Sequence, residues 1–470
     1  MPLDIGELQK SLIGLLRLIQ SLDGDPRAVA EHLRFPAYDG TLAGSELGAR
    51  LWTSTEGQDL VACLFSDEEL QKWFSPPPDS RLIEIWSRSA SFVRAWADSG
   101  TEPESFCAQW AAAFLAALRA ESVAVAAVQF FHGATLRENV ELIGGHLYLE
   151  PSSVEQLRQW LGYTGCREVE LLRIPREPMA MAVTICQSST AQLPRPILAT
   201  TVAGFTRVVL ERLRYDLWLV TGALLRPGYT WVVEQSPFPH QPLEHFAPGL
   251  LETFGGWFQD PRSAVVDNTA LISVVSRFGF LFEDDCPEEV AGPLLLAWRY
   301  AVPAIDSPDV RMALLLSYAA IDGLLRARDE DDSRVSSRVA RLIQAGAGEG
   351  RRIRRLMDRW RELRGLAAHG HPMPEDALLG FLEETALPTD LPSDRQFTIR
   401  MKRRCLQFLR RVFLTMLHLG VALEGTPIRP EPGLTRAQIL ELLDRANQGD
   451  ASAVSKLESL TPKWANAIDI

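Results

Sequence analysis

The stretch RWRELRGLAAHGHP, from Arg359 to Pro372, joins a basic helical pattern with regularly spaced leucines to a strong helix terminator. Gly370 and Pro372 form that terminator, because glycine just beyond the last turn and proline soon after it are typical of helix ends. The stretch therefore predicts a helix that ends close to His369. Inside it, Arg364 precedes His369 by four intervening residues.

Arg364 and His369 are the candidate catalytic pair. An arginine can bind a scissile phosphate and a histidine titrates near neutral pH, and metal-free cleavage of RNA needs both properties. The simpler interpretation is that both residues stabilise the helix end, where cationic side chains interact favourably with the helix dipole. On an ideal helix, residues five apart differ by about 140° in direction. The two side chains would therefore share a face only if the helix loosens near Gly370, or if a second chain completes the site.

The sequence on both sides of this helix adds an ordered set of further elements. Upstream, Ala297 to Ile343 holds a long apolar helical pattern that carries Asp322, then an acidic loop and a short basic helix. Downstream, after another acidic loop, Arg400 to Leu419 has the pattern of an amphipathic helix. In this order, the motifs from Thr269 to Ala422 resemble the ApeA-like branch of the HEPN superfamily. The resemblance covers about one third of the chain and implies a C-terminal HEPN helical bundle.

Transferred to this sequence, the family pattern makes Arg364 and His369 the catalytic residues. It gives Asp322 a supporting role, at a position where the family usually has Glu. The resemblance implies a metal-independent endoribonuclease of bacterial antiphage defence or toxin type, with no cofactor. Its reaction would be attack of a ribose 2′-hydroxyl on the adjacent phosphate, with His369 as general acid or base and Arg364 on the phosphoryl oxygens.

The same resemblance implies the partners. They are RNA, either tRNA or mRNA, a second copy of the chain in a homodimer or higher homo-oligomer, and a phage-derived or host trigger protein. Gly365 departs from the pattern, because active members usually have a polar residue there. A catalytically inactive HEPN module that binds a nucleotide or a protein is therefore the alternative, and a purely structural helical scaffold is a third interpretation.

Basic residues precede and surround the motif. The segment from Arg311 to Gly420 has 20 Lys and Arg against 14 Asp and Glu, whereas the whole chain has a net charge of −12. This local excess suits contact with RNA phosphates, which gives salt-sensitive binding without base specificity. A solvated basic helix face is the simpler interpretation. The candidate RNA-binding residues are Arg351, Arg352, Arg354, Arg355 and Arg361.

Other features near the motif admit two interpretations each. His371 is either a second titrating group or an exposed loop residue, and Trp360 either stacks on a base or lies in the core or a dimer interface. The acidic run from Asp329 to Asp332 either binds a cation or forms an inter-helix loop beside Ser333 as a helix cap. The sequence GAGEG, from Gly346 to Gly350, lacks a preceding strand and a following GK[ST], so it is predicted as a loop.

Composition excludes other classes of protein. Six cysteines are scattered without a CxxC pair, which argues against zinc sites and disulfides and for a reducing compartment. His240 and His245 lie in a Pro-rich loop without partners at metal-ligand spacing, so no metal site is predicted. No stretch has the pattern of a signal peptide or a membrane span. The sequence therefore predicts a cytoplasmic protein with no membrane partner.

The 470-residue chain divides into four predicted parts. Residues 1–120 have helical periodicity, interrupted by the breaker SPPPDS at Ser75 to Ser80. Residues 121–263 change to short β-branched runs with one long helix at about Leu198 to Val220. Residues 264–425 hold the HEPN-like helices, and residues 426–470 form a Pro-containing linker and two short helices. The predicted fold class is mainly α, with an α+β middle domain and a C-terminal HEPN helical bundle.

Overall fold

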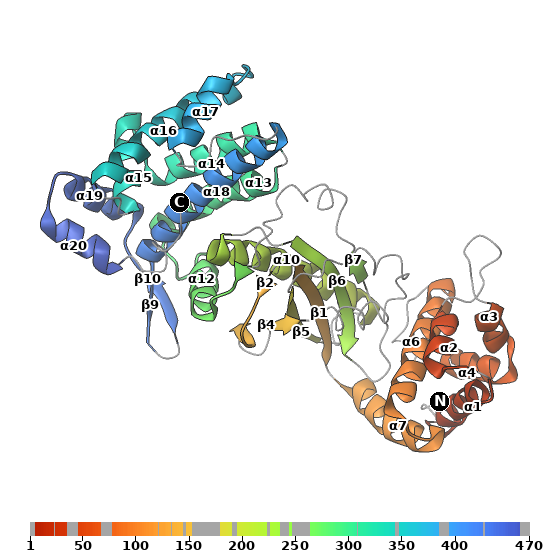
Figure 1. Ribbon diagram of the computed structural model, residues 1–470. Helices are drawn as coiled ribbons and strands as arrows, with labels where there is room; N and C mark the ends of the chain where they lie inside the picture. Colours follow the sequence, from red (N-terminus) through yellow and green to blue (C-terminus); the bar gives the residue numbers. More distant parts are fainter. Residues whose placement is uncertain are drawn as a thin grey trace. The chain divides into compact units, whose positions relative to one another are not determined.

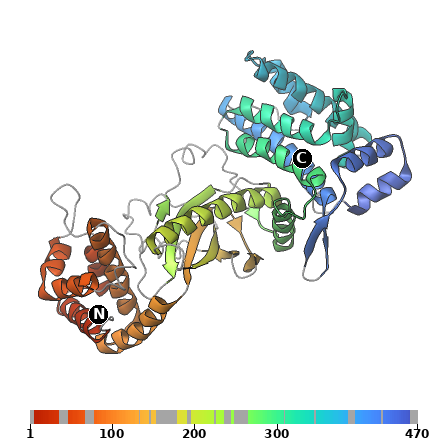
Figure 2. The same cartoon turned by 180° about the vertical axis from the view of Figure 1, so that it is seen from behind.

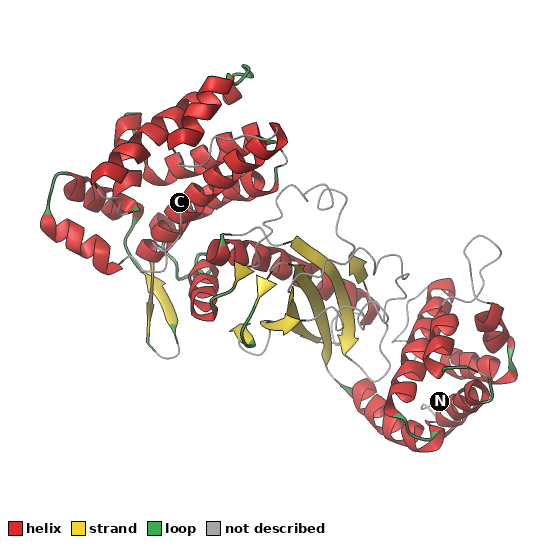
Figure 3. Ribbon diagram, in the orientation of Figure 1, coloured by secondary structure: helices red, strands yellow, loops and turns green. Residues whose placement is uncertain are grey.

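The chain forms two compact units. Unit 1 comprises Met1–Leu213 and Arg226–Glu252, and unit 2 comprises Arg214–Leu225 and Thr253–Ile470. Most of the described elements are helices and a small β-sheet accompanies them, so the predicted mainly helical class is confirmed (Figures 1 and 3). The computed structural model describes residues 5–22, 24–34, 46–66, 78–120, 122–132, 134–143, 147–152, 179–189, 195–222, 226–235, 244–246, 264–307, 309–343, 347–384, 394–425 and 428–460.

Unit 1 begins with a group of helices packed around a leucine-rich core. In the first of them, Leu8, Leu12, Leu15 and Ile19 recur at three- and four-residue spacing and are all buried. The first half of the SPPPDS breaker, residues 75–77, lies outside the described residues, and the next helix begins at its third proline, Pro78. The helices are α1 (Ile5–Gln20), α2 (Pro26–Arg34), α3 (Glu46–Thr53), α4 (Thr55–Ser66), α6 (Pro78–Ser99) and α7 (Pro103–Arg119).

A six-stranded antiparallel sheet follows, in the order β3-β4-β5-β1-β6-β7. Its middle strand β1 is rich in alanine, valine and phenylalanine, and Val128 lies opposite Val183 on one neighbour and Trp231 on the other. His245, predicted in a loop, lies in a strand, whereas His240 is outside the described residues. The strands of unit 1 are β1 (Ser122–His132), β2 (Ala134–Thr135), β3 (Val140–Ile143), β4 (Leu147–Ser152), β5 (Met179–Ser189), β6 (Arg226–Gln235) and β7 (Glu244–Phe246).

The predicted long helix is α10 (Arg195–Thr221). Its residues from Arg214 onward belong to unit 2. There Trp218 and Leu219 are buried in the hydrophobic core, so the C-terminal end of this helix is a structural part of the helical unit.

Unit 2, most of which is coloured green to blue in Figure 2, is organised around α14 (Val310–Leu325), which packs mainly against α13 (Glu288–Asp306), α16 (Ala347–Ala368) and α18 (Asp394–Gly420). Buried Leu314, Ile321 and Leu324 explain this position, because they line a continuous apolar stripe. The other elements of unit 2 are α12 (Asn268–Phe280), α13 (Glu288–Asp306), α15 (Asp332–Leu342), α16 (Ala347–Ala368), α17 (Glu375–Glu384), α18 (Asp394–Gly420), α19 (Arg436–Asn447), α20 (Ala451–Leu460), β8 (Ala264–Val265), β9 (Val421–Glu424) and β10 (Arg429–Pro432).

The segment after the motif helix, expected to be an acidic loop, instead contains α17. Its acidic residues cluster at the two ends, while Phe381 is fully buried and its ring lies 5.8 Å from that of Trp360. Burial of the apolar side chains in the middle of the segment therefore determines that it folds as a helix, despite its charged ends. Trp360 itself is fully buried, which confirms the core interpretation of this residue.

The C-terminal tail shares the core of unit 2. The two predicted short helices are present as α19 and α20, and Ile439, Leu443 and Leu457 are buried with the residues of the preceding helices. The segment predicted as a linker contains strand β10, which pairs with β9 immediately before that segment and places Pro430 opposite Leu423. The tail is thus part of the same folded unit.

Several basic side chains of unit 2 form hydrogen bonds to the backbone inside the fold. Buried Arg410 donates to the carbonyl oxygens of Leu219 and Val220 at the end of α10, and buried Arg411 donates to Ile343 at the end of α15. Lys402 likewise donates to the carbonyl oxygens of Ile305 and Ser307 at the end of α13. Arg436 donates to the carbonyl oxygen of Leu324 at the end of α14. These side chains satisfy helix carbonyls that would otherwise be unpaired. The local excess of positive charge is therefore partly structural.

Buried His418 makes the stability of unit 2 sensitive to acid. Burial and the nearby Arg277 lower the pKa of His418 from its ordinary value of 6.5 to about 3. The folded state thus excludes a proton that the unfolded chain binds between these two pH values, so stability is complete above pH 6.5 and falls as the pH drops toward 3. We expect a loss of about 1.4 kcal/mol per pH unit from this group. Urea unfolding of wild type and His418→Gln at pH 6.5, 6 and 5 measures it, and parallel pH slopes would refute it.

No helix in the described part of the chain combines the length and the apolar character that a membrane crossing requires.

Candidate functional site

The motif helix α16 ends where the sequence predicts. Gly370 adopts a positive φ of 69°, and its N–H donates to the carbonyl of Ala367 at 3.2 Å. The N–H of His371 donates to the carbonyl of Leu366 at 2.9 Å. Together the two hydrogen bonds form a Schellman motif, the usual way in which a glycine closes a helix. His369 and His371 therefore flank the closing glycine, and both are exposed.

The two histidines lie near each other, with ring centroids 6.1 Å apart. Arg364, one turn and a half earlier on α16, is only partly exposed and its guanidinium carbon lies 4.9 Å from the centre of the Tyr318 ring. Within the described residues, no hydrogen bond or ion pair joins Arg364 to His369. One copy of the chain thus places the two candidate residues on the same helix end without bringing them into contact.

Asp322 belongs to an ion network beside this helix end. Both of its carboxylate oxygens accept from Nε of Arg326, at 2.8 and 2.9 Å, and Arg326 also pairs with Asp332. Asp332 in turn accepts from Arg361 at 3.2 Å. Burial alone would raise the pKa of Asp332, but the hydrogen bonds from Arg326 and Arg361 outweigh it and lower the pKa. Asp332 is therefore held in the charged form by arginines other than Arg364.

The predicted RNA-binding arginines differ in their availability. Arg351 is exposed and Arg352 partly so, and in the described part of the chain neither is hydrogen-bonded or ion-paired. Arg354 donates to the Gly350 carbonyl of its own helix at 3.3 Å. Arg355 pairs with Glu384 at 2.7 Å, and Arg361 with Asp332. Arg351 and Arg352 are thus the members of the set that can meet phosphate without losing a protein partner.

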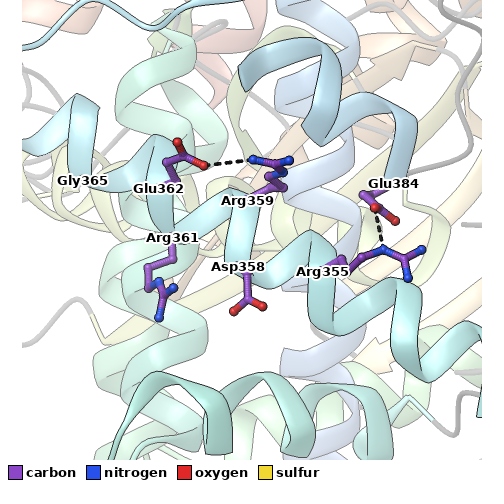
Figure 4. Close-up of a pocket in the computed structure, with 7 residues that line it drawn as sticks. All are labelled: Arg355, Asp358, Arg359, Arg361, Glu362, Gly365 and Glu384. Atoms are coloured by element: carbon purple, nitrogen blue, oxygen red, sulfur yellow. Dashed lines mark hydrogen bonds and ion pairs between the residues drawn. The ribbon is translucent and has the colours of Figure 1, made fainter. Parts of the chain in front are cut away.

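An open pocket of about 550 Å³ lies between α16 and α17. In Figure 4, Arg355 points toward Glu384 and Arg359 toward Glu362, so its positive and negative side chains are largely paired. This pairing makes the pocket a weak anion site. Its lining residues are Arg355, Asp358, Arg359, Arg361, Glu362, Gly365 and Glu384.

Gly365 lies at the edge of this pocket, next to Arg364 in the chain. A Cβ added there would meet no heavy atom within 4 Å beyond the helix itself. The space that a polar side chain would fill is therefore open, so steric constraint does not explain why this position is glycine.

Gly365→Ala is expected to stabilise unit 2 by about 0.5–1 kcal/mol, because glycine in a helix loses more backbone entropy on folding than alanine. The urea midpoint should rise with an unchanged dependence on urea concentration. Gly370→Ala is the matched control, since its positive φ makes alanine unfavourable there. An equal effect of both substitutions would contradict this prediction.

The remaining predicted features have structural partners. In the acidic run, Glu330 pairs with Arg338 and Arg334, and Asp331 caps α15 by accepting from the Arg334 N–H. The cap is thus Asp331 and not Ser333, whose hydroxyl donates to it at 2.6 Å. Among the described residues, no group of three metal-binding side chains is present.

The predicted GAGEG loop is partly helical. Gly346 lies outside the described residues, whereas Ala347–Gly350 forms the first turn of α16.

Sequence reasoning missed Tyr318 and Arg326. Tyr318 and Asp322, and Asp322 and Arg326, are each four residues apart and therefore lie on one face of α14. That spacing was the available signal, but it gives no information about contact with α16, which depends on the packing of two helices.

No family model matches the chain, and neither a curated protein nor a solved structure is significantly similar to it.

Proposed function

We propose that the protein is a metal-independent endoribonuclease whose C-terminal helices form a HEPN-type bundle. The observation that carries the proposal is Arg364 near the end of α16: it is held against the Tyr318 ring, without a hydrogen-bond or ion-pair partner in the described residues, and exposed His369 follows the same helix. A partly exposed arginine without a carboxylate partner is suited to bind phosphate.

In the proposed reaction, the ribose 2′-hydroxyl attacks the adjacent phosphorus and the 5′-oxygen leaves, which produces a cyclic phosphate. Arg364 binds the phosphoryl oxygens, and His369 removes the proton from the nucleophile or supplies one to the leaving oxygen. His369 and Arg364 of one chain do not meet. A homodimer that brings two α16 ends together would supply both groups to one phosphate.

The proposal includes the partners and the setting. The substrate is tRNA or mRNA, Arg351 and Arg352 contact its backbone, and Asp322 keeps Arg326 in place beside the site. We assign the protein to bacterial antiphage defence in the cytoplasm, where unit 1 responds to a phage-derived or host trigger and restrains the ribonuclease.

The second candidate is a catalytically inactive module of the same shape that binds a nucleotide or a protein. Gly365 favours it, because the pocket edge next to Arg364 carries no polar side chain. The charge pairing of the pocket and the internal use of several arginines also reduce the surface available to RNA.

A cleavage assay on a mixed tRNA and mRNA pool in EDTA separates the two candidates. Purified wild type is compared with Arg364→Ala, alone and with lysate from phage-infected cells. Cleavage by wild type that Arg364→Ala lacks supports the enzyme. Binding of RNA or a protein partner without cleavage under any trigger supports the inactive module.

A further inference from the structure

The ring beneath Arg364 is immobilised on its other side. Tyr318 is 1% exposed, and its ring lies 5.9 Å from that of Trp360 in an edge-to-face arrangement. Trp360 is fixed in turn, because its Nε1 donates to the Leu314 carbonyl of α14 at 3.1 Å and its ring contacts Phe381 and Phe408. The Tyr318 ring therefore has the rigidity of the core, although one side of it carries a partly exposed cation.

A guanidinium over an aromatic ring is held without using its N–H groups. The attraction is between the cation and the ring electrons, so all five donors of Arg364 stay available for phosphate oxygens. An ion pair with a carboxylate would hold the side chain equally well but would occupy those donors. The ring thus fixes the direction of Arg364 and leaves its binding capacity intact.

Two carboxylates act on the same Tyr318 ring that Arg364 contacts. Burial raises the pKa of Tyr318 to about 12, and the charges of Asp332 and Asp322 add to this rise. Both acids are already bonded to Arg326, and Asp332 also to Arg361. This arrangement keeps the two carboxylates from pairing with Arg364.

We propose that Tyr318 is a positioning residue that orients the Arg364 guanidinium toward phosphate through its ring alone. The inference rests on the proposed ribonuclease function. The Tyr318 hydroxyl takes no part: it stays protonated at neutral pH, and no described residue hydrogen-bonds to it.

Tyr318→Phe and Tyr318→Leu test the role of the ring. Tyr318→Phe keeps the ring and should cleave RNA at the wild-type rate. Tyr318→Leu should reduce kcat about tenfold, because Arg364 then samples other directions. Thermal unfolding of both variants identifies a temperature at which each is fully folded, and the kinetic comparison is made there.

A double-mutant cycle separates positioning from a general structural effect. Its readout is the affinity for an RNA with one 2′-deoxynucleotide at the cleaved position, so that no 2′-hydroxyl is available there for attack. Tyr318→Leu should weaken binding in the wild-type background and have no effect in the Arg364→Ala background. An equal loss in both backgrounds would overturn the positioning role.

The outcomes distinguish this inference from the proposed function. Active wild type with equally active Tyr318→Leu overturns the inference and leaves the ribonuclease intact. A wild type that neither cleaves nor binds RNA overturns both.

Discussion

Arg338→Ala is expected to destabilise unit 2 by about 3–5 kcal/mol, because it removes a buried cation from two carboxylates. The Arg338 side chain is 2% exposed and bonds to both oxygens of Glu330 and both of Asp444. It also donates to the Leu325 carbonyl at 2.7 Å. These bonds use all five N–H groups and join α14, the following loop, α15 and α19. Without the cation, Glu330, which is 12% exposed, would be left with a largely desolvated charge.

Urea unfolding of the full chain measures this loss, with Arg334→Ala as the matched control. Arg334 pairs with the same Glu330 at 3.0 Å, but its side chain is 60% exposed. Exposed pairs contribute little, so the control should change stability by less than about 1 kcal/mol. Equal losses in the two variants would contradict the assigned role of the buried arginine.

The stability of unit 2 at acidic pH should also depend on the interaction between Arg338 and Glu330. The hydrogen bond from Arg338 lowers the pKa of Glu330 from 4.5 to about 2. The folded pKa lies below the unfolded one, so the contribution is complete above pH 4.5 and is lost as the pH falls toward 2. Arg338→Ala should therefore show less additional destabilisation between these pH values than wild type.

His369→Ala is expected to reduce RNA cleavage by about 10²–10⁴-fold, the usual contribution of a general acid or base. His371→Ala is the matched control, since its ring lies 6.1 Å from that of His369, is also exposed and belongs to the residue on the other side of Gly370. The control should stay within about threefold of wild type, as expected of a residue with no proton to transfer.

Both histidine variants should unfold at the wild-type urea concentration, because neither side chain is buried. A loss of cleavage in His371→Ala as large as in His369→Ala would show that the two histidines act together. Full activity of His369→Ala would remove it from the mechanism.

The sequence predicted elements whose apolar periodicity is undisturbed. The end of α16 at Gly370 and the positions of α19 and α20 follow from local signals: a glycine terminator, a Thr435 capping box and regularly spaced leucines. α17 was missed because acidic residues frame it, although Phe381 in its middle is fully buried. Its stability comes from packing on Trp360, which no local pattern reveals.

The candidate site was predictable in its residues but not in its contacts. The positions of Arg364 and His369 at one helix end followed from the motif, whereas the Tyr318 ring beneath Arg364 required the packing of α14 on α16. Charge counting was less informative. The count for residues 311–420 included Arg338, Lys402 and Arg410, and all three are buried.

Cleavage of a short RNA in EDTA, beside the same RNA with one 2′-deoxynucleotide at the cleaved position, tests the central claim most directly. Attack by the 2′-hydroxyl predicts that the all-ribose RNA is cut and carries a cyclic phosphate on its 3′ end, while the deoxy-substituted RNA stays intact at that position. Equal cutting of both RNAs, or loss of cutting in EDTA, would contradict the account.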